Sequence, residues 1–375
     1  MRIRRLIVMG LIFGGMLMGM LGCSSGEKKD APVKKSVIEH GITSSKVRVY
    51  GRNELGSMVI RANWINSGIE IHFKGEKLDL EINCPDYQQD AEPYIQVWID
   101  GERESRIMMK PGNEKYTVAK GLKYGEHKVK VLMVTESYYT PLSFMRMTIT
   151  SSEGESMLLA PESGKDEMVF DFYGDSITAG FGTIPGYPDG YRTKDQDSSL
   201  TYAYRTAEHF GADANFVAIS GWGCYQGYGG DRNGVIPRIW RYASMSSGME
   251  WDFSGRDADI VVVSLGTNDA WFWTEQMPKQ DFIDSYLAFL SELRQEYPKA
   301  QFYCLHGMMD ESFRDIVKEA AHQYSEKDSI GAVYVDMPNM GEKPEYTGSG
   351  GHPSGEFGAY ASTFLIKAIE ENYKN

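Results

Sequence analysis

Three short polar segments of this 375-residue chain contain residue types that together can carry out acyl transfer. They are Gly174-Asp175-Ser176, Gly266-Thr267-Asn268-Asp269 and Gly351-His352-Pro353. A serine hydroxyl becomes an effective nucleophile when a histidine accepts its proton, and an asparagine amide can stabilise the oxyanion that then forms. This combination predicts a hydrolase in which Ser176 is the nucleophile, His352 the general base and Asn268 an oxyanion-hole donor.

The serine and asparagine segments each follow a run of branched and aromatic residues, 168–173 and 260–265. Such a run, ended by glycine, is typical of a buried strand that enters a tight turn. A third run, 215–220, is followed by Gly221-Trp222-Gly223. Ligands of open α/β sheets bind at the carboxyl ends of the strands, so we expect these turns to share one edge. Taken singly, each segment could equally be an ordinary turn or an Asx cap.

His352 differs in context from the other six histidines. It lies in a glycine-rich loop, 348–354, directly before a segment whose apolar residues recur at helical spacing from 357 to 369. In this order the three segments resemble the signature of the SGNH (GDSL-type) hydrolases, over a region from residue 168 to the C-terminus. The resemblance implies that the backbone N–H of Ser176 and that of a glycine join Asn268 in the oxyanion hole, without metal or cofactor. Gly221 matches the position of that glycine best, and Gly223 is the alternative.

One position departs from the pattern of that family. Most SGNH hydrolases have an aspartate three residues before the histidine, and this chain has Ser349 there. The imidazole normally needs a third group that fixes its tautomer. Either a backbone carbonyl of the loop 348–350 or a carboxylate could take this role, the candidates being Glu345, Asp336 and Glu356. We expect a working Ser-His dyad, because serine, asparagine and histidine are all present; an inactive descendant is the alternative.

Strand-like and helical patterns alternate in the C-terminal part of the chain. Strand-like runs end near residues 173, 220, 265, 305 and 336, and helical patterns occupy 201–210, 281–297 and 311–326. This alternation predicts βαβ units and a parallel sheet. The resemblance implies a flavodoxin-like three-layer α/β domain, which we place at residues 165–375.

Between residues 44 and 152 the pattern has a period of two, which predicts antiparallel strands. Lys74-Gly75 and Asp100-Gly101 fit hairpin turns. We therefore expect an all-β sandwich of jelly-roll type at 37–160. A sandwich before an SGNH domain resembles the two-domain carbohydrate esterases of family 2, which remove acetyl groups from polysaccharides such as xylan and glucomannan. Arg52 and the segment 98–101 fit short motifs of that family, and the sandwich either binds sugar or only frames the site.

Aromatic residues are frequent in the turns at the predicted site. Trp222, Tyr225 and Tyr228 follow the glycine segment, and Trp271, Phe272 and Trp273 follow Asn268-Asp269. Aromatic rings present large apolar faces with little conformational entropy to lose, which suits a sugar ligand. Trp222, Tyr225, Trp271 and Trp273 are our candidate substrate-binding residues; packing between the two domains is the alternative role.

The N-terminus has the layout of an export signal. Residues 1–5 are basic, 6–21 are apolar, and Met20-Leu21-Gly22-Cys23 resembles a bacterial lipobox. This predicts a lipoprotein signal peptide at 1–22, lipidation of Cys23 and a flexible polar tether at 23–36. The protein would be an exported bacterial lipoprotein, anchored to the membrane and facing either the periplasm or the outside. An uncleaved transmembrane anchor is the alternative, although the apolar run is short for a span.

The composition limits the classes of partner and cofactor. Lys and Arg number 39 against 52 Asp and Glu, a formal net charge of −13. A chain this acidic repels a phosphate backbone, so no nucleic-acid partner is expected. Apart from Cys23, only Cys84, Cys224 and Cys304 are present, which predicts neither a disulfide framework nor a zinc site.

These observations lead to one functional expectation with two alternatives. The expected function is a serine esterase that removes acetyl groups from an acetylated polysaccharide or oligosaccharide through an acyl-enzyme. The first alternative is an SGNH lipase or aryl esterase, which a deep apolar acyl channel would favour. The second is an inactive glycan-binding lipoprotein, which the absence of any group orienting His352 would favour.

Overall fold

The computed structural model describes residues 35–136, 140–164, 167–186, 192–245 and 247–373. They belong to one compact unit, Lys34–Asn375. The predicted signal peptide 1–22, Cys23 and almost all of the tether lie outside the described residues. In the described part of the chain, no helix combines the length and apolar character needed to cross a membrane.

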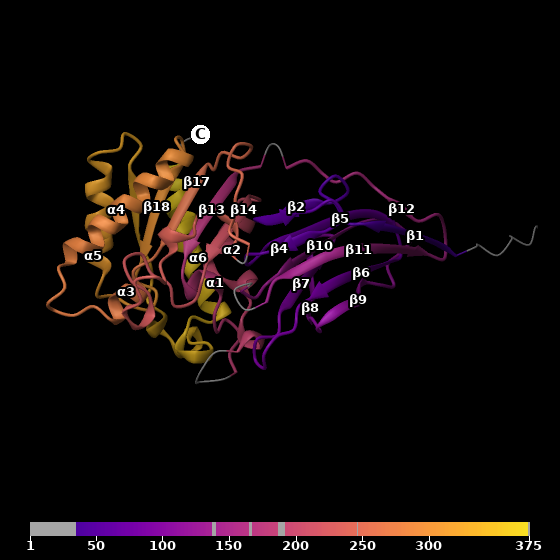
Figure 1. Ribbon diagram of the computed structural model, residues 1–375, viewed down its shortest axis with the longest axis horizontal. Coiled ribbons are helices and arrows are strands. Elements are labelled where there is room, and N and C mark those ends of the chain that lie inside the picture. Colours follow the sequence, from indigo (N-terminus) through magenta and orange to yellow (C-terminus); the bar gives the residue numbers. More distant parts are fainter. Residues whose placement is uncertain (1–34, 137–139, 165–166, 187–191, 246, 374–375) are drawn as a thin grey trace, which may run out of the picture. The chain divides into compact units, whose positions relative to one another are not determined.

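The N-terminal part of this unit is a sandwich of two antiparallel sheets (Figure 1). The first sheet contains β1 (Ser36–Gly41), β3 (Asn53–Leu55), β4 (Ile60–Ala62), β6 (Lys77–Cys84), β9 (Gly112–Ala119) and β11 (Leu142–Ser151). The second contains β2 (Arg48–Tyr50), β5 (Gly68–Gly75), β7 (Tyr94–Ile99), β8 (Glu102–Met108), β10 (Gly125–Met133) and β12 (Met157–Leu158).

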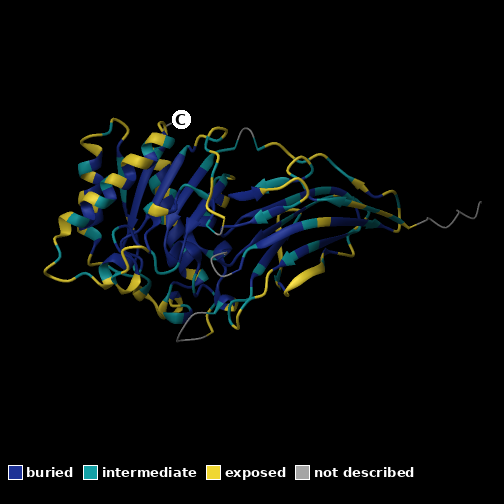
Figure 2. Cartoon of the chain, viewed as in Figure 1, coloured by how far each residue is buried: buried dark blue, intermediate teal, exposed yellow. Residues whose placement is uncertain are grey.

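Alternation of side chains builds the core of the sandwich. In β5, Ile69, Ile71 and Phe73 are fully buried, whereas the residues between them are half-buried. Inward-facing residues of both sheets form one apolar cluster, which is what two sheets packed face to face require. The end strands β8 and β9 carry most of the exposed positions (Figure 2).

One of the two predicted hairpins is confirmed and the other is wrong. Asp100 and Gly101 have φ values of 53° and 91° and connect the paired strands β7 and β8, as a tight hairpin turn requires. Lys74 and Gly75, in contrast, are the last two residues of β5. The next strand, β6, pairs with β11 and β9 in the other sheet. The chain therefore crosses between the sheets there, a difference that local turn chemistry does not encode.

The C-terminal part is an α/β domain. Its sheet contains five parallel strands, β13 (Val169–Gly174), β14 (Asp213–Ala218), β17 (Ile260–Ser264), β18 (Gln301–His306) and β19 (Ala332–Asp336). The helices are α1 (Ser176–Ala179), α2 (Tyr202–His209), α3 (Thr267–Trp271), α4 (Lys279–Glu296), α5 (Arg314–Ser325) and α6 (Gly355–Asn372). A two-stranded ribbon, β15 (Tyr242–Ser244) and β16 (Met249–Glu250), lies outside this sheet. Short 3-10 turns occupy Thr193–Asp195, Ser198–Leu200, Tyr228–Gly230, Ile236–Arg238, Met340–Glu342, Pro344–Tyr346 and Ser349–Gly351.

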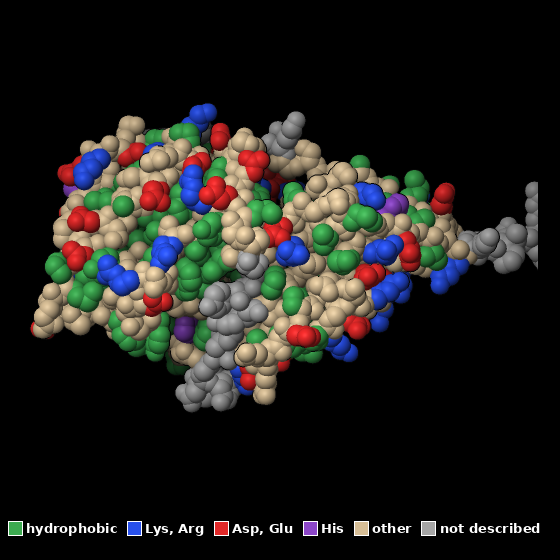
Figure 3. All heavy atoms as spheres, viewed as in Figure 1, with side chains coloured by type: hydrophobic (Ala, Val, Ile, Leu, Met, Phe, Trp, Pro, Cys, Tyr) green, Lys and Arg blue, Asp and Glu red, His purple; other side chains and the backbone are tan. Residues whose placement is uncertain are grey.

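The strand order is β14-β13-β17-β18-β19, the order of flavodoxin-like sheets. Helices α4 and α5 share an apolar cluster with one face of the sheet, and α2 and α6 share a second cluster with the other face. Three layers result, and the predicted fold class, an all-β sandwich followed by a flavodoxin-like α/β domain, is confirmed. On the face shown in Figure 3, acidic and basic side chains are interspersed over both domains.

A buried arginine joins the sandwich to the first parallel strand. Arg52, between β2 and β3, is fully buried, and its Nη2 donates to Asp171 Oδ2 at 2.9 Å. The same nitrogen donates to the hydroxyls of Tyr173 at 2.8 Å and Tyr297 at 3.2 Å. Because Asp171 and Tyr173 belong to β13, this ion pair holds the strand that leads to Ser176.

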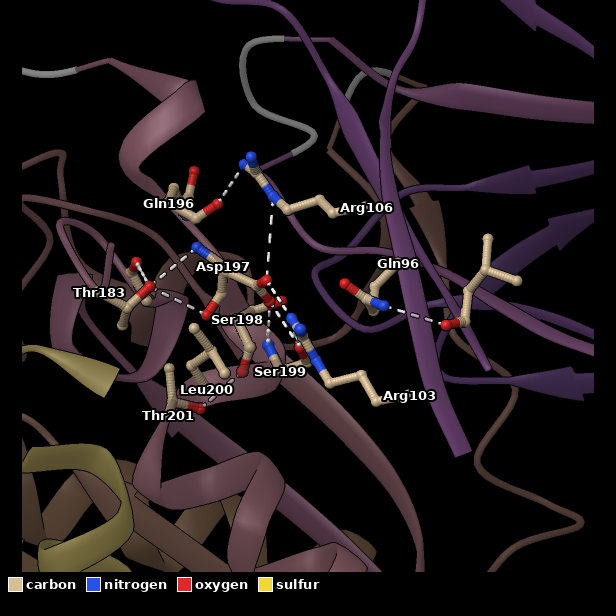
Figure 4. A network of polar contacts seen from close by, with 12 residues as sticks. Gln96, Arg103, Arg106, Thr183, Gln196, Asp197, Ser198, Ser199, Leu200 and Thr201 are labelled. Carbon is tan, nitrogen blue, oxygen red and sulfur yellow. Dashed lines mark hydrogen bonds and ion pairs between the residues drawn. The ribbon is translucent and has the colours of Figure 1, made fainter. Parts of the chain in front are cut away.

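A second polar contact between the domains surrounds Asp197 (Figure 4). Arg103 of β8 donates to Asp197 Oδ2 at 2.6 Å, and Arg106 of the same strand donates to the carbonyl of Gln196 at 2.7 Å. Asp197 Oδ1 accepts from the backbone N–H of Ser199 at 3.0 Å. Arginine side chains of the sandwich therefore contact both the backbone and the side chains of the loop between α1 and α2.

We predict that Arg52→Met lowers the free energy of unfolding by about 3–5 kcal/mol, because it leaves the buried Asp171 carboxylate without its cation. Urea denaturation measures the change. The control is Lys367→Met, which breaks the exposed pair between Lys367 and Glu371 and should cost less than about 0.5 kcal/mol. A loss below about 1 kcal/mol for Arg52→Met would contradict the role assigned to this ion pair.

Candidate active site

The three predicted segments meet at the carboxyl edge of the parallel sheet. Ser176 begins α1 directly after β13, Asn268 lies in α3 directly after β17, and His352 lies shortly before α6. The strands β13 and β17 are neighbours, and the strand order reverses between them, which is where α/β sheets bind their ligands. One cleft contains all three residues, and its lining is Ser176, Phe181, Ser220, Gly221, Trp222, Gly227, Tyr228, Asp231, Gly234, Asn268, Gly350 and His352.

Ser176 and His352 are in hydrogen-bond contact. Ser176 Oγ lies 2.9 Å from His352 Nε2, and His352 Nδ1 lies 3.0 Å from the carbonyl oxygen of Gly350. A carbonyl can only accept, so this second bond requires the proton of the neutral imidazole on Nδ1. Nε2 then faces the serine hydroxyl as an acceptor, the tautomer that a general base needs.

The group that orients His352 is therefore a backbone carbonyl, one of the alternatives that the sequence left open. Gly350 has φ 58° and Gly351 φ 67°, a left-handed turn that favours glycine. The hydroxyl of Ser349 donates to the carbonyl of Ile184 at 3.0 Å and not to the imidazole. Among the described residues no carboxylate is hydrogen-bonded to His352; Asp336, one of the candidates, instead accepts from Arg314.

The three predicted oxyanion-hole residues, Ser176, Gly221 and Asn268, line the same cleft. Within the described part of the chain, the backbone N–H groups of Ser176 and Gly221 have no acceptor. Gly221 has φ 82°, a left-handed conformation that favours glycine. The N–H of Gly223 is occupied by the carbonyl of Gly234 at 3.1 Å, so Gly221 is the glycine with a donor to offer. Asn268 Nδ2 donates to the carbonyl of Trp222 at 2.9 Å, and only a long contact of 3.4 Å to Asp175 involves its second hydrogen.

Two buried aspartates support this arrangement. Asp175 caps α1 by accepting from the N–H of Ile177 at 2.9 Å. Asp269 accepts from three consecutive N–H groups, those of Cys224, Tyr225 and Gln226, at 2.7–2.9 Å. Burial raises the pKa of Asp175 to about 7 and that of Asp269 to about 6. Both carboxyl groups therefore brace backbone turns beside the cleft.

The predicted substrate-binding aromatics divide into two groups. Trp222 lines the cleft, as does Tyr228, which is 66% exposed. Tyr225 and Trp273 pack against each other with ring centroids 5.2 Å apart, and neither lines the cleft. Trp271 is 64% exposed and also lies outside the lining. Tyr225 and Trp273 thus pack inside the α/β domain. The sequence could not show this, because the spacing of aromatic residues does not distinguish a ring that faces the core from one that faces the cleft.

Several residues of the site were not singled out from the sequence. Phe181 packs against the imidazole of His352 at a centroid distance of 4.2 Å, and Asp231 also lines the cleft. The role of Asp269, which adjoins Asn268, could have been inferred from the sequence. An aspartate in a turn directly after a strand commonly accepts hydrogen bonds from backbone N–H groups. Among the described residues, no three His, Cys, Asp or Glu side chains are grouped as metal binding would need.

Comparison with known proteins covers both domains. Residues 49–161 match the family described as Carbohydrate esterase 2 N-terminal, and residues 172–357 match the GDSL-like Lipase/Acylhydrolase family. A Cellulase/esterase CelE of Acetivibrio thermocellus is 28% identical over 297 residues, which are 78% of this chain. The chain spans only 35% of the length of that relative.

Two further relatives extend over most of both chains. An Acetylxylan esterase / glucomannan deacetylase of Cellvibrio japonicus is 24% identical over 326 residues, 82% of this chain and 85% of that protein. A solved family two carbohydrate esterase from Clostridium thermocellum, in complex with cellohexaose, superposes on this chain with a TM-score of 0.78 at 26% identity. The match covers 87% of this chain and 98% of the chain of that structure. The two domains of this chain therefore match, in order, the N-terminal domain of carbohydrate esterase family 2 and a GDSL-like (SGNH) hydrolase domain, which is the two-domain architecture of the family 2 carbohydrate esterases.

Proposed function

We propose that this protein is a serine esterase that removes acetyl groups from acetylated polysaccharide or oligosaccharide. The observation that carries the proposal is the chain of two hydrogen bonds from Ser176 Oγ through His352 to the carbonyl of Gly350. A serine hydroxyl held by a neutral imidazole of defined tautomer is the central requirement of acyl transfer. The N–H groups of Ser176 and Gly221, which line the same cleft, support an oxyanion hole beside this serine.

In the proposed acylation step, Ser176 Oγ attacks the carbonyl carbon of the acetyl ester while its proton moves to His352 Nε2. The negative charge that develops on the carbonyl oxygen is stabilised by the N–H groups of Ser176 and Gly221 and by Asn268 Nδ2. The tetrahedral intermediate then collapses, and the sugar hydroxyl leaves with the proton from His352. Water repeats the sequence on the acetylated serine and releases acetate. Throughout these steps the proton stays on His352 Nδ1, which donates a hydrogen bond to the carbonyl of Gly350.

The carbohydrate substrate is supported by the cleft and by the relatives. The cleft is lined by Trp222 and Tyr228, whose rings can lie against sugar faces. The Cellvibrio japonicus relative is named an acetylxylan esterase and glucomannan deacetylase, and the Clostridium thermocellum structure contains cellohexaose. Of the candidate binding residues, Trp222 keeps this role in the proposal, and Tyr228 joins it.

We also propose that the enzyme works as an exported lipoprotein attached to the membrane through Cys23. This part of the proposal rests on the sequence of residues 1–25 alone. An enzyme tethered outside the cytoplasm would meet polysaccharide fragments where they are generated or imported.

We predict that the protein releases acetate from acetylated xylan or acetylated glucomannan, and that Ser176→Ala abolishes this release, because the acyl-enzyme cannot form. Acetate is measured enzymatically, beside hydrolysis of an aryl acetate. His209→Ala is a matched control, since its imidazole pairs with Glu370 on the surface, and it should retain full activity. Activity on the aryl ester alone would point to a small-ester or lipid esterase. Binding of glycan without turnover of any ester would contradict the esterase.

We further predict that His352 titrates below the ordinary histidine pKa of about 6.5, because burial lowers the pKa of this imidazole more than the bond to Gly350 raises it. The base must be neutral to act, so kcat/KM should stay high as the pH falls to about 6.5 and decline only below it. NMR titration of the imidazole, assigned with His352→Ala, separates this group from Asp175 and Asp269. A pKa of His352 at or above about 6.5 would contradict this environment.

A further inference from the structure

The proposed oxyanion hole has two backbone donors, and they come from different parts of the α/β domain. The N–H of Ser176 is at the start of α1, and the N–H of Gly221 is in the turn after β14. A donor contributes to catalysis only when it is held at the right distance from the other donors before the reaction begins. Whatever fixes α1 relative to this turn therefore determines how well the oxyanion is bound.

Glu136 of the sandwich reaches directly into this junction. It follows β10 and is 2% exposed. Its Oε1 accepts from the backbone N–H of Ser220 at 2.7 Å, and its Oε2 accepts from Ser220 Oγ at 2.7 Å. Ser220 immediately precedes Gly221, so both its main chain and its side chain are tied to the sandwich by one carboxyl group.

The same carboxyl group is connected to the nucleophile helix. Gln196 Nε2 donates to Glu136 Oε2 at 3.1 Å and to the carbonyl of Ala179, the last residue of α1, at 2.9 Å. The backbone N–H of Glu136 donates in return to Gln196 Oε1 at 3.3 Å. Arg106 of the sandwich holds the carbonyl of Gln196, as Figure 4 shows.

We propose that Glu136 is a positioning residue of the oxyanion hole, which the sandwich contributes to the active site of the α/β domain. Through Ser220 on one side and Gln196 on the other, Glu136 sets the separation between the N–H of Gly221 and that of Ser176. The sandwich is therefore part of the catalytic machinery rather than only a frame or a sugar-binding module. This inference rests on the proposed esterase function.

Other contacts of the turn do not make Glu136 redundant. The N–H of Ile219 donates to the carbonyl of Gly174 at 3.3 Å, and the N–H of Tyr228 donates to the carbonyl of Gly221 at 2.7 Å. Each holds the chain on one side of Ser220. Glu136 is the group that holds Ser220 itself and that connects, through Gln196, with α1.

The test compares Glu136→Ala and Glu136→Gln with the wild-type enzyme, using an aryl acetate as substrate and methylboronic acid as a tetrahedral mimic bound to Ser176. In Glu136→Gln the side chain keeps its shape, but an NH₂ group, which cannot accept, replaces one of the two oxygens that accept hydrogen bonds. We expect kcat to fall by about tenfold or more in Glu136→Ala and by less in Glu136→Gln, with KM within about twofold. The boronate dissociation constant should rise by a factor similar to the fall in kcat.

The boronate measurement separates positioning from folding. Calorimetry reports the fraction of binding-competent protein beside the dissociation constant, so irreversibly misfolded protein lowers the first and leaves the second unchanged. Urea denaturation checks that each variant is folded under the assay conditions, because reversible unfolding would weaken the apparent binding of the boronate. Arg103→Met is the matched control, because it removes another contact between the domains, that with Asp197, without touching Ser220. It should leave kcat and boronate binding unaltered.

The inference is overturned if boronate binding in Glu136→Ala or Glu136→Gln equals that of the wild type, or if Arg103→Met loses as much. If Glu136→Ala does not fold, Glu136→Gln decides. A wild-type protein that hydrolyses no ester would refute the proposed function instead. Calorimetry of boronate binding then still tests the geometry, because it needs no turnover.

Discussion

The order of the parallel strands is the constraint on which the site depends. Because β13 lies between β14 and β17, the turns that follow these three strands open at one edge of the sheet. They bring Ser176, Gly221 and Asn268 to a single cleft, although the three residues are far apart in the chain. The loop before α6 only has to deliver His352 to the same edge. Arg52 stabilises this arrangement, because its ion pair with Asp171 joins β13 to the sandwich.

Burial is the largest cause of the pKa shifts of the acidic groups near the cleft. Asp175, Asp269 and Glu136 are buried near the residues of the proposed oxyanion hole, and burial raises the pKa of each. Hydrogen bonds from backbone N–H groups offset the free-energy cost of burying these carboxyl groups. The same hydrogen bonds stabilise the turns that carry the N–H groups. His352, in contrast, has no acidic partner in the described structure. Its tautomer is set by the carbonyl of Gly350, and burial lowers the pKa of the imidazole more than this hydrogen bond raises it.

Much of this structure could be predicted from the sequence, for reasons that differ between residues. Period-two and helical patterns record which faces are buried, so the strands, the helices and the turns of Ser176 and Asn268 could be located. The same patterns could not show that Lys74-Gly75 precedes a crossing between sheets, or that Tyr225 and Trp273 pack on each other. Contacts between residues far apart in the sequence could not be predicted either. Glu136 meets Ser220 across 84 positions, and nothing in its surrounding sequence marks it as part of the site.

Trapping the acyl-enzyme tests most directly whether Ser176 is the nucleophile and His352 its base. The protein is mixed with an aryl acetate, quenched with acid during turnover, digested and analysed by mass spectrometry. We expect one acetyl group on the peptide that contains Ser176, and we expect it to be absent in His352→Ala, because the hydroxyl then has no base. Turnover without an acetylated Ser176 peptide, or an acetyl group confined to another residue, would contradict the central claim that Ser176 and His352 form the working dyad.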